Sequence, residues 1–318
     1  MGFAELHLHL EGTLEPELAF ELAERNHVQL PWRDVDDLRS RLDYGCLQDF
    51  LDIYYANMAV LRTEADFAEL TDAYLARAAR AGVVRAEVFL DLQAHTARGV
   101  PAEVVLAGVS DALSRSEADH GVSSGLIVTF LRHLSADDAE RAYDQALATG
   151  VELLGIGLCS SEVGFPAAPF APLWQRARAD GLHTVAHAGE EGGPDYVWEA
   201  LRELKVERVD HGIRAMEDPA LVAHLVEHRI PLTSCPLSNV RLKAVPSLAA
   251  HPLPAMLDAG LVVTVNSDDP AYFGGYLDDN LAAVRDQFGL SQDQLDTLAR
   301  NSIEASFLPA ADKARLLG

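Results

Sequence analysis

The sequence predicts an α/β protein built as a single (β/α)8 TIM barrel, with a helical insertion after the first strand and extra helices at the carboxyl end. Its 318 residues suit one barrel, which typically needs about 250, with additions. Short runs rich in β-branched residues alternate with amphipathic helical stretches, which is the pattern of a parallel sheet with helical crossovers. No dinucleotide-binding glycine motif follows the first run, so a closed barrel is favoured over an open doubly wound sheet.

Eight segments are expected to form the barrel strands, and each ends at a polar, Gly or Pro break. In chain order these segments are residues 4–10, 84–91, 125–133, 151–159, 183–188, 208–211, 231–235 and 261–266. A largely helical insertion from about residue 16 to residue 81 separates the first two, and its aromatic residues Phe50, Tyr54 and Tyr55 make it a candidate lid. Two or more helices are expected after Tyr276, packed outside the barrel. Because no repeat or low-complexity linker interrupts the chain, residues 1–318 are interpreted as one domain.

The composition argues against several classes of partner. Hydrophobic residues make up 49% of the chain, yet no apolar run reaches the roughly 18 residues of a membrane-spanning helix. The net charge of −24 repels phosphate backbones and anionic lipid, so neither nucleic acid nor a membrane is expected as a partner. The amino terminus lacks the pattern of a signal peptide, so a cytoplasmic location is expected. Cys46, Cys159 and Cys235 show no metal-binding or disulfide spacing and are interpreted as reduced and mostly buried.

Four separated segments carry side chains typical of metal binding or proton transfer. They are Glu5-Leu6-His7-Leu8-His9, His187-Ala188-Gly189-Glu190, Asp210-His211-Gly212 and Asn266-Ser267-Asp268-Asp269-Pro270. In a strand, residues two apart point to the same side, so one ion can bind both His7 and His9. A catalytic zinc ion takes three or four nitrogen or oxygen ligands, and His187 and Asp268 are the candidates for the rest. Glu190 and His211 are then left for proton transfer.

The position of these segments favours one shared site. In a (β/α)8 barrel the chemistry lies at the carboxyl ends of the strands, and these residues follow the expected strands one, five, six and eight. Strands eight and one are neighbours in a closed barrel, so Asp268 should reach the two amino-terminal histidines. Each segment alone allows a plainer interpretation: half-buried polar residues at 7 and 9, a loop start at 187–190, or a turn or helix cap at 268–270.

The remaining histidines are assigned no role. Surface positions are expected for His27, His120, His224, His228 and His251, which have no partner at ligand spacing. His95 and His133 are expected at the ends of strands two and three, where a structural hydrogen bond is at least as favoured as a place in the pocket. Residues 235–239, after strand seven, are either an active-site wall or, as we prefer, a buried strand end.

Several motifs together resemble the adenosine/adenine deaminase family of the amidohydrolase superfamily. They are residues 5–12 (Glu5-Leu6-His7-Leu8-His9-Leu10-Glu11-Gly12), 187–190, 209–212 and 267–270, and the resemblance runs from about residue 4 to residue 308. Residues 160–162 (Ser160-Ser161-Glu162), 235–239 and 266–276 look like the adenine deaminase branch, which acts on the free base. The chain departs from that branch at Cys159, where the branch usually has Asp.

The resemblance implies one zinc ion per chain and hydrolytic deamination of a 6-aminopurine, with adenine to hypoxanthine and ammonia as the expected reaction of purine salvage. Two-metal relatives usually carry a modified lysine at a strand end, and Lys205, Lys243 and Lys313, the only lysines, lie elsewhere. The implied roles are as follows: a protonated Glu190 donates to N1, His211 accepts or orients the proton of the attacking water, Asp269 binds N7, and Ser160, Ser161 and Glu162 face the N3/N9 edge.

Alternatives remain within and outside this family. Adenosine and N6-substituted adenines are alternative substrates, and another mononuclear zinc hydrolase of the same fold, such as an amide or lactone hydrolase, is an alternative activity. A metal-binding regulatory protein without turnover is disfavoured, because it would not need both Glu190 and His211 beside an open metal position. A small purine is the expected partner, and a homo-oligomer is compatible with the sequence.

Overall fold

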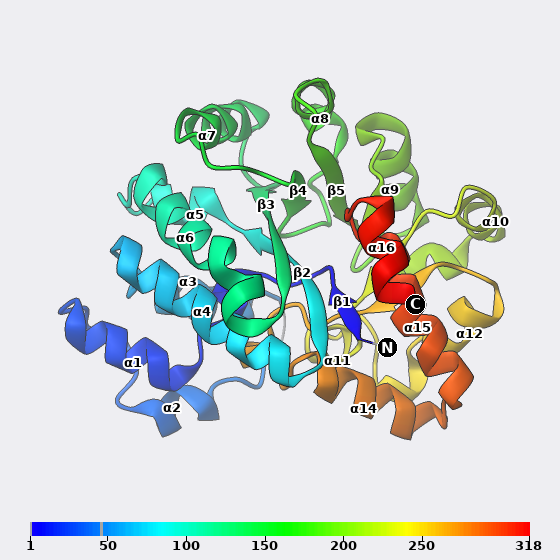
Figure 1. Cartoon of the computed structure of the whole chain (residues 1–318), viewed down its shortest axis with the longest axis horizontal. Helices are drawn as coiled ribbons and strands as arrows, with labels where there is room; N and C mark the ends of the chain where they lie inside the picture. Colours follow the sequence, from blue (N-terminus) through cyan, green and yellow to red (C-terminus); the bar gives the residue numbers. More distant parts are fainter. Residues whose placement is uncertain (1, 45–46) are drawn as a thin grey trace.

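The computed structural model describes residues 2–44 and 47–318, so Cys46 lies outside the described residues. Within this part of the chain, eight parallel strands form one sheet in sequence order and helices surround it (Figure 1). The (β/α)8 barrel predicted from the sequence is confirmed. The strands are β1 (Phe3–Glu5), β2 (Val83–Leu90), β3 (Ser123–Leu131), β4 (Gly155–Cys159), β5 (His183–Ala188), β6 (Arg208–His211), β7 (Leu232–Ser234) and β8 (Val263–Val265).

The first strand is shorter than expected. Its regular ladder with β2 ends at Glu5, whereas the sequence pattern predicted a strand to residue 10. Beyond Glu5 the backbone is shared between two neighbours: Leu8 pairs with Asp268 and His9 pairs with Phe89, each through an isolated bridge. The hydrophobic alternation continues through this stretch, but the partner strand changes, so a continuous ladder cannot form.

The barrel closes through the segments that carry the predicted metal ligands. Leu6 N–H donates to the side-chain oxygen of Asn266 at 2.9 Å, and Asp268 N–H donates to His7 carbonyl oxygen at 3.1 Å. His9 N–H then donates to Asp268 carbonyl oxygen at 2.9 Å. The junction between the first and last strands therefore holds His7, His9 and Asp268 beside one another through the backbone.

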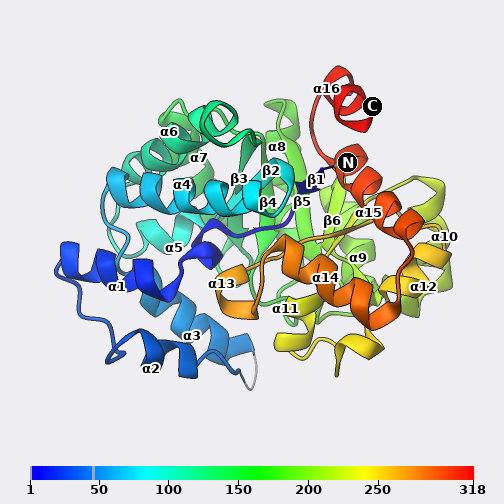
Figure 2. The ribbon, with the colours of Figure 1, turned by 60° about the horizontal axis from the view of Figure 1, so that its bottom comes forward.

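The connection between β1 and β2 is helical, as predicted. It contains η1 (Leu10–Thr13), α1 (Pro16–Arg25), α2 (Val35–Ser40), α3 (Leu47–Met58) and α4 (Glu64–Arg80). Thr63 and Asp66 form a capping box that begins α4, whose buried face packs against β2 and α6 (Ala102–His120). Helix α4 is thus the crossover helix of the barrel, and α1 to α3 are the insertion. Figure 2 shows α1 to α3 at the same end of the molecule as α11 (Pro236–Arg241) and α13 (Pro270–Phe273).

The remaining helices follow β2 and the later strands along the chain. They are α5 (Leu92–Thr96), α7 (Ala136–Ala148), η2 (Ala168–Phe170), α8 (Ala171–Ala179), α9 (Pro194–Glu199), η3 (Ala200–Leu204), η4 (Ile213–Glu217), α10 (Pro219–Glu227), η5 (Leu248–Ala250), α12 (Leu253–Asp258), α14 (Leu277–Phe288), α15 (Gln292–Ala305) and α16 (Ala310–Leu317). Helix α15 packs on β1 and β8, and the Phe307 ring stacks on His183 with centroids 4.0 Å apart.

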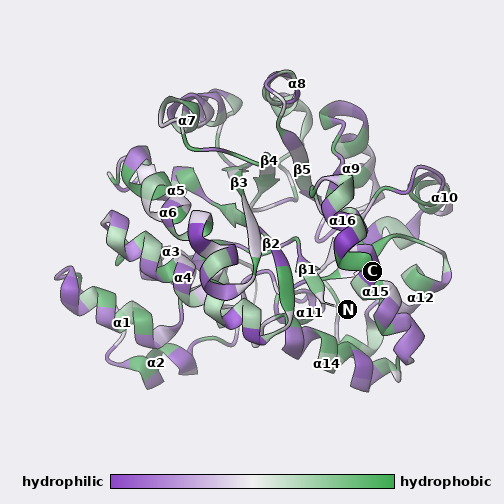
Figure 3. Cartoon of the chain, in the orientation of Figure 1, coloured by the Kyte–Doolittle hydropathy of each residue, from purple (hydrophilic) through white to green (hydrophobic). Residues whose placement is uncertain are grey.

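The hydropathy of the chain follows this arrangement. Many helices are hydrophilic along one face and hydrophobic along the other (Figure 3), and the buried residues between strands and helices form one large apolar cluster. Among the described residues, no helix combines the length and the apolarity that crossing a bilayer requires.

Candidate active site

Residues from the carboxyl ends of the strands meet around one cavity. The regular strands β2, β3, β4, β5, β6 and β8 end next to it, and helix α3 of the insertion covers it. Its lining residues are His9, Phe50, Leu51, Tyr54, Tyr55, Asp91, Leu131, Cys159, Ser160, His187, Glu190, His211, Leu242, Asp268 and Asp269. The cavity therefore lies at the end of the barrel where a (β/α)8 protein carries its chemistry.

Three imidazoles and one carboxylate meet at the base of this cavity. His9 Nε2 lies 3.1 Å from His187 Nε2 and 3.7 Å from Asp268 Oδ1, and His7 Nε2 lies 3.4 Å from the same oxygen. All four side chains are buried, and one ligand atom of each lies within 4.8 Å of the others. The structure thus brings together the four residues that the sequence predicted to bind the metal.

Groups behind the imidazoles leave the Nε2 atoms free for an ion. His7 Nδ1 lies 2.9 Å from Thr233 Oγ1, whose hydroxyl in turn donates to Asp210 Oδ1 at 3.0 Å. Nδ1 of His187 lies 3.5 Å from Asp210 Oδ2. Because the Thr233 hydroxyl proton is used on Asp210, His7 carries its own proton on Nδ1. Partners of this kind fix the tautomer of metal-binding histidines.

The residues present fit a single small cation. Nitrogen ligands about 2.0–2.1 Å from a tetrahedral zinc ion lie roughly 3.3 Å apart, close to the separations of 3.1 to 3.7 Å found here. His7 Nε2 is also buried and has no hydrogen-bond partner among the described residues. A buried polar atom left in that state is costly unless it binds something. The cluster therefore has the donor atoms and the dimensions that a metal-ion site requires.

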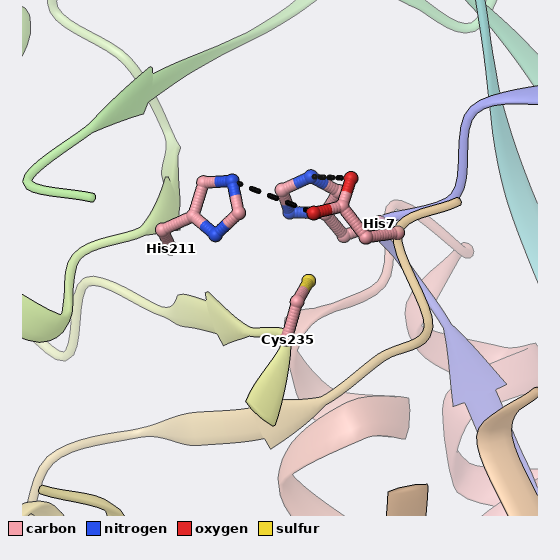
Figure 4. A group of neighbouring side chains, drawn as sticks. His7, His211 and Cys235 are labelled. Carbon is pink, nitrogen blue, oxygen red and sulfur yellow. Dashed lines mark ion pairs between the residues drawn. The ribbon is translucent and has the colours of Figure 1, made fainter. Parts of the chain in front are cut away.

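A thiol lies beside the same atoms. His7, His211, Cys235 and Asp268 form a second group whose ligand atoms lie within 4.8 Å of one another (Figure 4). Burial raises the pKa of Cys235 well above its usual range, and only the thiolate is a strong ligand. The donor set of His7, His9, His187 and Asp268 is therefore the better metal site. Cys235 and Cys159 are both buried free thiols, as expected.

Glu190 and His211 lie together next to the metal site. Glu190 Oε2 is 3.4 Å from His211 Nε2, and Glu190 Oε1 accepts a hydrogen bond from Asn239 Nδ2 at 3.2 Å. Burial, reinforced by the negative charge of Asp268, raises the pKa of Glu190 well above its usual range. Burial lowers the pKa of His211. A protonated carboxyl and a neutral imidazole therefore face the cavity.

Asp269 presents a second carboxyl group to the cavity. Its side chain is buried, and Oδ1 has no hydrogen-bond partner among the described residues. Burial raises the pKa of Asp269 well above its usual range, despite the opposing attraction of His9. A protonated carboxyl in this position can donate one hydrogen bond to a ligand.

The three residues expected at the N3/N9 edge lie in different places. Ser160 lines the cavity, and its hydroxyl lies 2.9 Å from His133 Nδ1. Ser161 and Glu162 do not line it. The Glu162 carboxylate is buried and accepts hydrogen bonds of 2.6 to 3.1 Å from the backbone N–H groups of residues 189 to 192. This corrects its expected position at the substrate edge: Glu162 holds the loop that carries Glu190.

Three of the predicted site residues adopt a left-handed backbone conformation. Ser160, His211 and Asp268 have φ values of 75°, 66° and 65°, which cost energy in residues other than glycine. Each stands at or after the end of a strand, where the turn re-aims the chain. Strain of this kind concentrates at functional sites, because the surrounding structure must hold the residue in place.

Several residues of the site were missed by the sequence analysis. Asp91 lines the cavity and could have been found, because it ends the second expected strand. Asn239 lies between Glu190 and His211; its segment, residues 235–239, was considered as an active-site wall, but a buried strand end was preferred. His251 was expected at the surface but is only 3% exposed and lies 3.2 Å from Asn239. His95 was expected to end a strand, but it lies in α5, buried and 2.7 Å from Glu11.

Known proteins are similar to this chain in sequence. The sequence profile of the family described as adenosine deaminase matches residues 3–318. An adenine deaminase of Streptomyces coelicolor is 59% identical over 312 residues, 98% of this chain and 92% of that protein. An adenine deaminase of Sphingopyxis alaskensis is 57% identical over 314 residues, 99% of this chain and 92% of that protein.

Solved structures agree with these relatives. The crystal structure of an adenine deaminase from Arthrobacter aurescens matches with a TM-score of 0.98 at 56% identity, covering 99% of this chain and 97% of that one. An amidohydrolase from Burkholderia ambifaria, solved with bound Zn, matches with a TM-score of 0.90 at 28% identity, covering 99% of this chain and 88% of that one.

Proposed function

Because the chain belongs to the adenosine deaminase family, we propose that it hydrolyses adenine to hypoxanthine and ammonia. The observation that carries this proposal is the joint placement of a metal-ligand cluster, a protonated carboxyl and a neutral imidazole around one cavity. The relatives named adenine deaminase, at 57% and 59% identity over nearly the whole chain, support adenine as the substrate.

We propose that His7, His9, His187 and Asp268 hold one zinc ion. The donor set of three imidazoles and one carboxylate, the separation of its atoms and the bound Zn of the Burkholderia amidohydrolase support this choice. None of the lysines lines the cavity, so no lysine bridge to a second metal is available there. When bound, zinc lowers the pKa of a coordinated water and so supplies a strong nucleophile near neutral pH.

Glu190 is the proposed proton carrier. Its raised pKa keeps the carboxyl protonated, so it can donate to N1 of the purine as water adds to C6. That proton neutralises the negative charge that addition at C6 places on N1. After this transfer the Glu190 carboxylate can take up a proton and deliver it to the leaving amine. Asn239, 3.2 Å away, orients the carboxyl group throughout.

Asp269 and Ser160 are the proposed contacts to the rest of the base. Asp269 lines the cavity, and its Oδ1 has no hydrogen-bond partner among the described residues, so its carboxyl can donate to N7. Ser160 lies on the part of the lining formed after β4 and offers a hydroxyl to the N3/N9 edge. A free base presents an N–H at that edge, whereas a nucleoside presents a ribose.

The insertion is the proposed lid. Phe50, Tyr54 and Tyr55 of α3 line the cavity, and the Phe50 ring packs 4.6 Å from Phe273 in α13. Tyr54 also points its hydroxyl at Asp91 Oδ2, 3.4 Å away. These aromatic side chains exclude water from the reacting atoms, which strengthens the hydrogen bonds to the base.

A substrate panel tests the reaction. Zinc-loaded enzyme is given adenine, adenosine, AMP and N6-alkyl adenines, and ammonia release is followed. Adenine should be preferred over adenosine by about 10⁴-fold in kcat/KM, because a site built to hydrogen-bond a group rejects analogues that lack it. Comparable values for the two would reject base specificity, and no turnover of any purine would reject the proposed function.

Two variants separate the proposed roles. Asp268→Ala should lose both metal and activity, because it removes a ligand. Glu190→Gln should keep its metal and lose turnover, because glutamine keeps the shape but supplies no proton. Metal content by elemental analysis and ammonia release are measured on both. Turnover near that of the unmodified enzyme in Glu190→Gln would overturn its assignment, and two tightly bound metals per chain would overturn the single-ion site.

A further inference from the structure

We infer that His251 is a positioning residue: through Asn239 it holds His211 in the tautomer that carries its proton on Nε2, so that His211 orients the attacking water as a hydrogen-bond donor. The tautomer assignment comes from contacts alone, and its catalytic meaning rests on the proposed deamination.

The chain of hydrogen bonds starts at a backbone group whose direction is certain. Leu253 N–H, at the beginning of α12, lies 3.1 Å from His251 Nδ1. A backbone N–H can only donate, so Nδ1 must accept and carries no proton. His251 is 3% exposed and, in the described part of the chain, has no carboxylate among its hydrogen-bond partners. The neutral ring therefore carries its proton on Nε2. Burial also lowers the pKa of His251 to about 4, which keeps the ring neutral.

This proton sets the orientation of the Asn239 amide. His251 Nε2 lies 3.2 Å from Asn239 Oδ1, and a second, longer contact of 3.4 Å joins it to the Ser234 hydroxyl. With N–H on Nε2, the atom of Asn239 that faces His251 must be the oxygen. The two hydrogens of Asn239 Nδ2 then point the other way. Asn239 Nδ2 lies 3.2 Å from Glu190 Oε1 and 3.3 Å from His211 Nδ1, so both hydrogens have an acceptor.

The orientation of Asn239 in turn decides which nitrogen of His211 is protonated. His211 Nδ1 receives a hydrogen from Asn239, so the neutral ring carries its own proton on Nε2. That nitrogen faces Glu190 Oε2 at 3.4 Å and Asp268 Oδ2 at 3.9 Å. The Nε2 atom of His211 therefore presents an N–H donor to the reacting atoms and has no lone pair that could accept a proton. The sequence had left open whether His211 accepts or orients the proton, and this arrangement selects the second.

The proton of the attacking water then passes to Glu190. Once Glu190 has donated to N1 it is a carboxylate, and it lies against His211 Nε2. The carboxylate accepts the water proton as the C6–O bond forms. It passes that proton to the amine as the C6–N bond breaks and takes the remaining hydroxyl proton as C6 becomes a carbonyl. One proton of water thus ends on ammonia and the other replaces the proton that Glu190 gave to N1, so Glu190 returns to its starting form.

Substitutions at residues 239 and 251 test this chain. His251→Phe removes the hydrogen bonds to Leu253, Asn239 and Ser234 and frees the Asn239 amide to turn. His251→Gln keeps an N–H₂ donor near the former Nε2 and should retain the orientation of Asn239. Asn239→Asp replaces the donor with an acceptor, so His211 should move its proton to Nδ1. Ser234→Ala is the matched control, because it removes the longer contact of His251 and leaves Asn239 in place.

The deciding measurement is ¹⁵N NMR of histidine-labelled, zinc-loaded enzyme, with the His211 signals identified by their loss in His211→Asn. We expect a protonated Nε2 and an unprotonated Nδ1 in the unmodified enzyme, in His251→Gln and in Ser234→Ala. In Asn239→Asp we expect a protonated Nδ1 and an unprotonated Nε2, and in His251→Phe a mixture of the two tautomers. A proton on Nδ1 of His211 in the unmodified enzyme, or an unchanged tautomer in His251→Phe, would overturn the inference.

Kinetics supply the second readout. His251→Phe should lower kcat for adenine by about 10- to 100-fold, the usual effect of removing such a supporting partner, while KM and zinc content stay nearly unchanged. His251→Gln should recover most of the lost kcat. A higher KM or a lower zinc content, with kcat unchanged, would show that the role of His251 is merely structural. If the unmodified enzyme fails to deaminate adenine, the proposed function fails, but the NMR measurement still decides the tautomer.

Discussion

The hydroxyl of Ser238 donates a hydrogen bond of 2.6 Å to Asp268 Oδ2, while Oδ1 of the same carboxylate lies 3.4 Å from His7 Nε2. Ser238 therefore holds the proposed ligand with one oxygen toward the imidazoles. Ser238→Ala should weaken metal affinity by about 10- to 100-fold, because partners of this kind orient metal ligands. Competition with a chelator measures the affinity. Ser234→Ala, a neighbouring buried serine without contact to a proposed ligand, should bind metal as the unmodified protein does.

Metal removal should loosen the junction between the first and last strands. His7, His9 and Asp268 are joined there by backbone hydrogen bonds of 2.9 and 3.1 Å. A ligand that binds only the folded state stabilises it by about 4 kcal/mol at 1,000 times its dissociation constant. Chelated protein should therefore melt at a lower temperature and exchange the amide hydrogens of His9 and Asp268 faster. Unchanged exchange at these two amides would show that metal binding does not stabilise the junction between the first and last strands.

Glu162→Gln should displace the loop that carries Glu190. The carboxylate of Glu162 accepts hydrogen bonds from the four backbone N–H groups of residues 189 to 192. In Glu162→Gln the side-chain N–H₂ group, which can only donate, would replace one of the accepting oxygens. Hydrogen bonds to a charged group contribute about 1.5–3 kcal/mol, so lower stability and a lower kcat are expected, with metal content retained. Chemical unfolding and ammonia release measure these. Glu217→Gln, which breaks an exposed ion pair with Arg214, should change neither.

Gly12→Ala should disturb Asp269 and leave the metal site in place. A Cβ atom at Gly12 would lie 2.6 Å from the Cα of Asp269, closer than such atoms approach one another. The backbone of Asp269 must then move, and its carboxyl would leave the position proposed to face N7. The variant should therefore match Asp269→Asn in raising KM or lowering kcat for adenine at unchanged metal content. Normal kinetics in Gly12→Ala would contradict the proposed contact.

His251 should make the protein sensitive to acid. Burial lowers its pKa to about 4 in the folded chain, against about 6.5 when unfolded. Between these pH values the unfolded chain binds more protons than the folded chain, so the free energy of unfolding rises with pH. The contribution of His251 is therefore lost as the pH falls from 6.5 toward 4. From pH 7.5 to pH 5 the loss due to His251 should be about 2 kcal/mol. Urea unfolding at both pH values, with His251→Gln as the non-titrating control, measures it, and equal losses in the two proteins would contradict the assignment.

Much of the fold follows from patterns that are local in the sequence. Alternating apolar runs and amphipathic stretches mark strands and helices because each element must bury one face, and eight such runs leave few arrangements of a parallel sheet. The same logic places His187, His211 and Asp268 at strand ends. Since the carboxyl ends of the strands in a barrel share one edge, residues far apart in the chain can be predicted to meet.

Contacts made across the folded chain decided the rest. Glu162 follows a strand as Ser160 does, but the surrounding loop amides, and not the cavity, take up its carboxylate. His251 was expected at the surface because it has no partner at ligand spacing, and it is nevertheless buried, because α12 and residue 239 pack against it. Which side a polar group faces depends on partners brought from other segments, so the sequence determined which residues are available and the tertiary structure decided what each one binds.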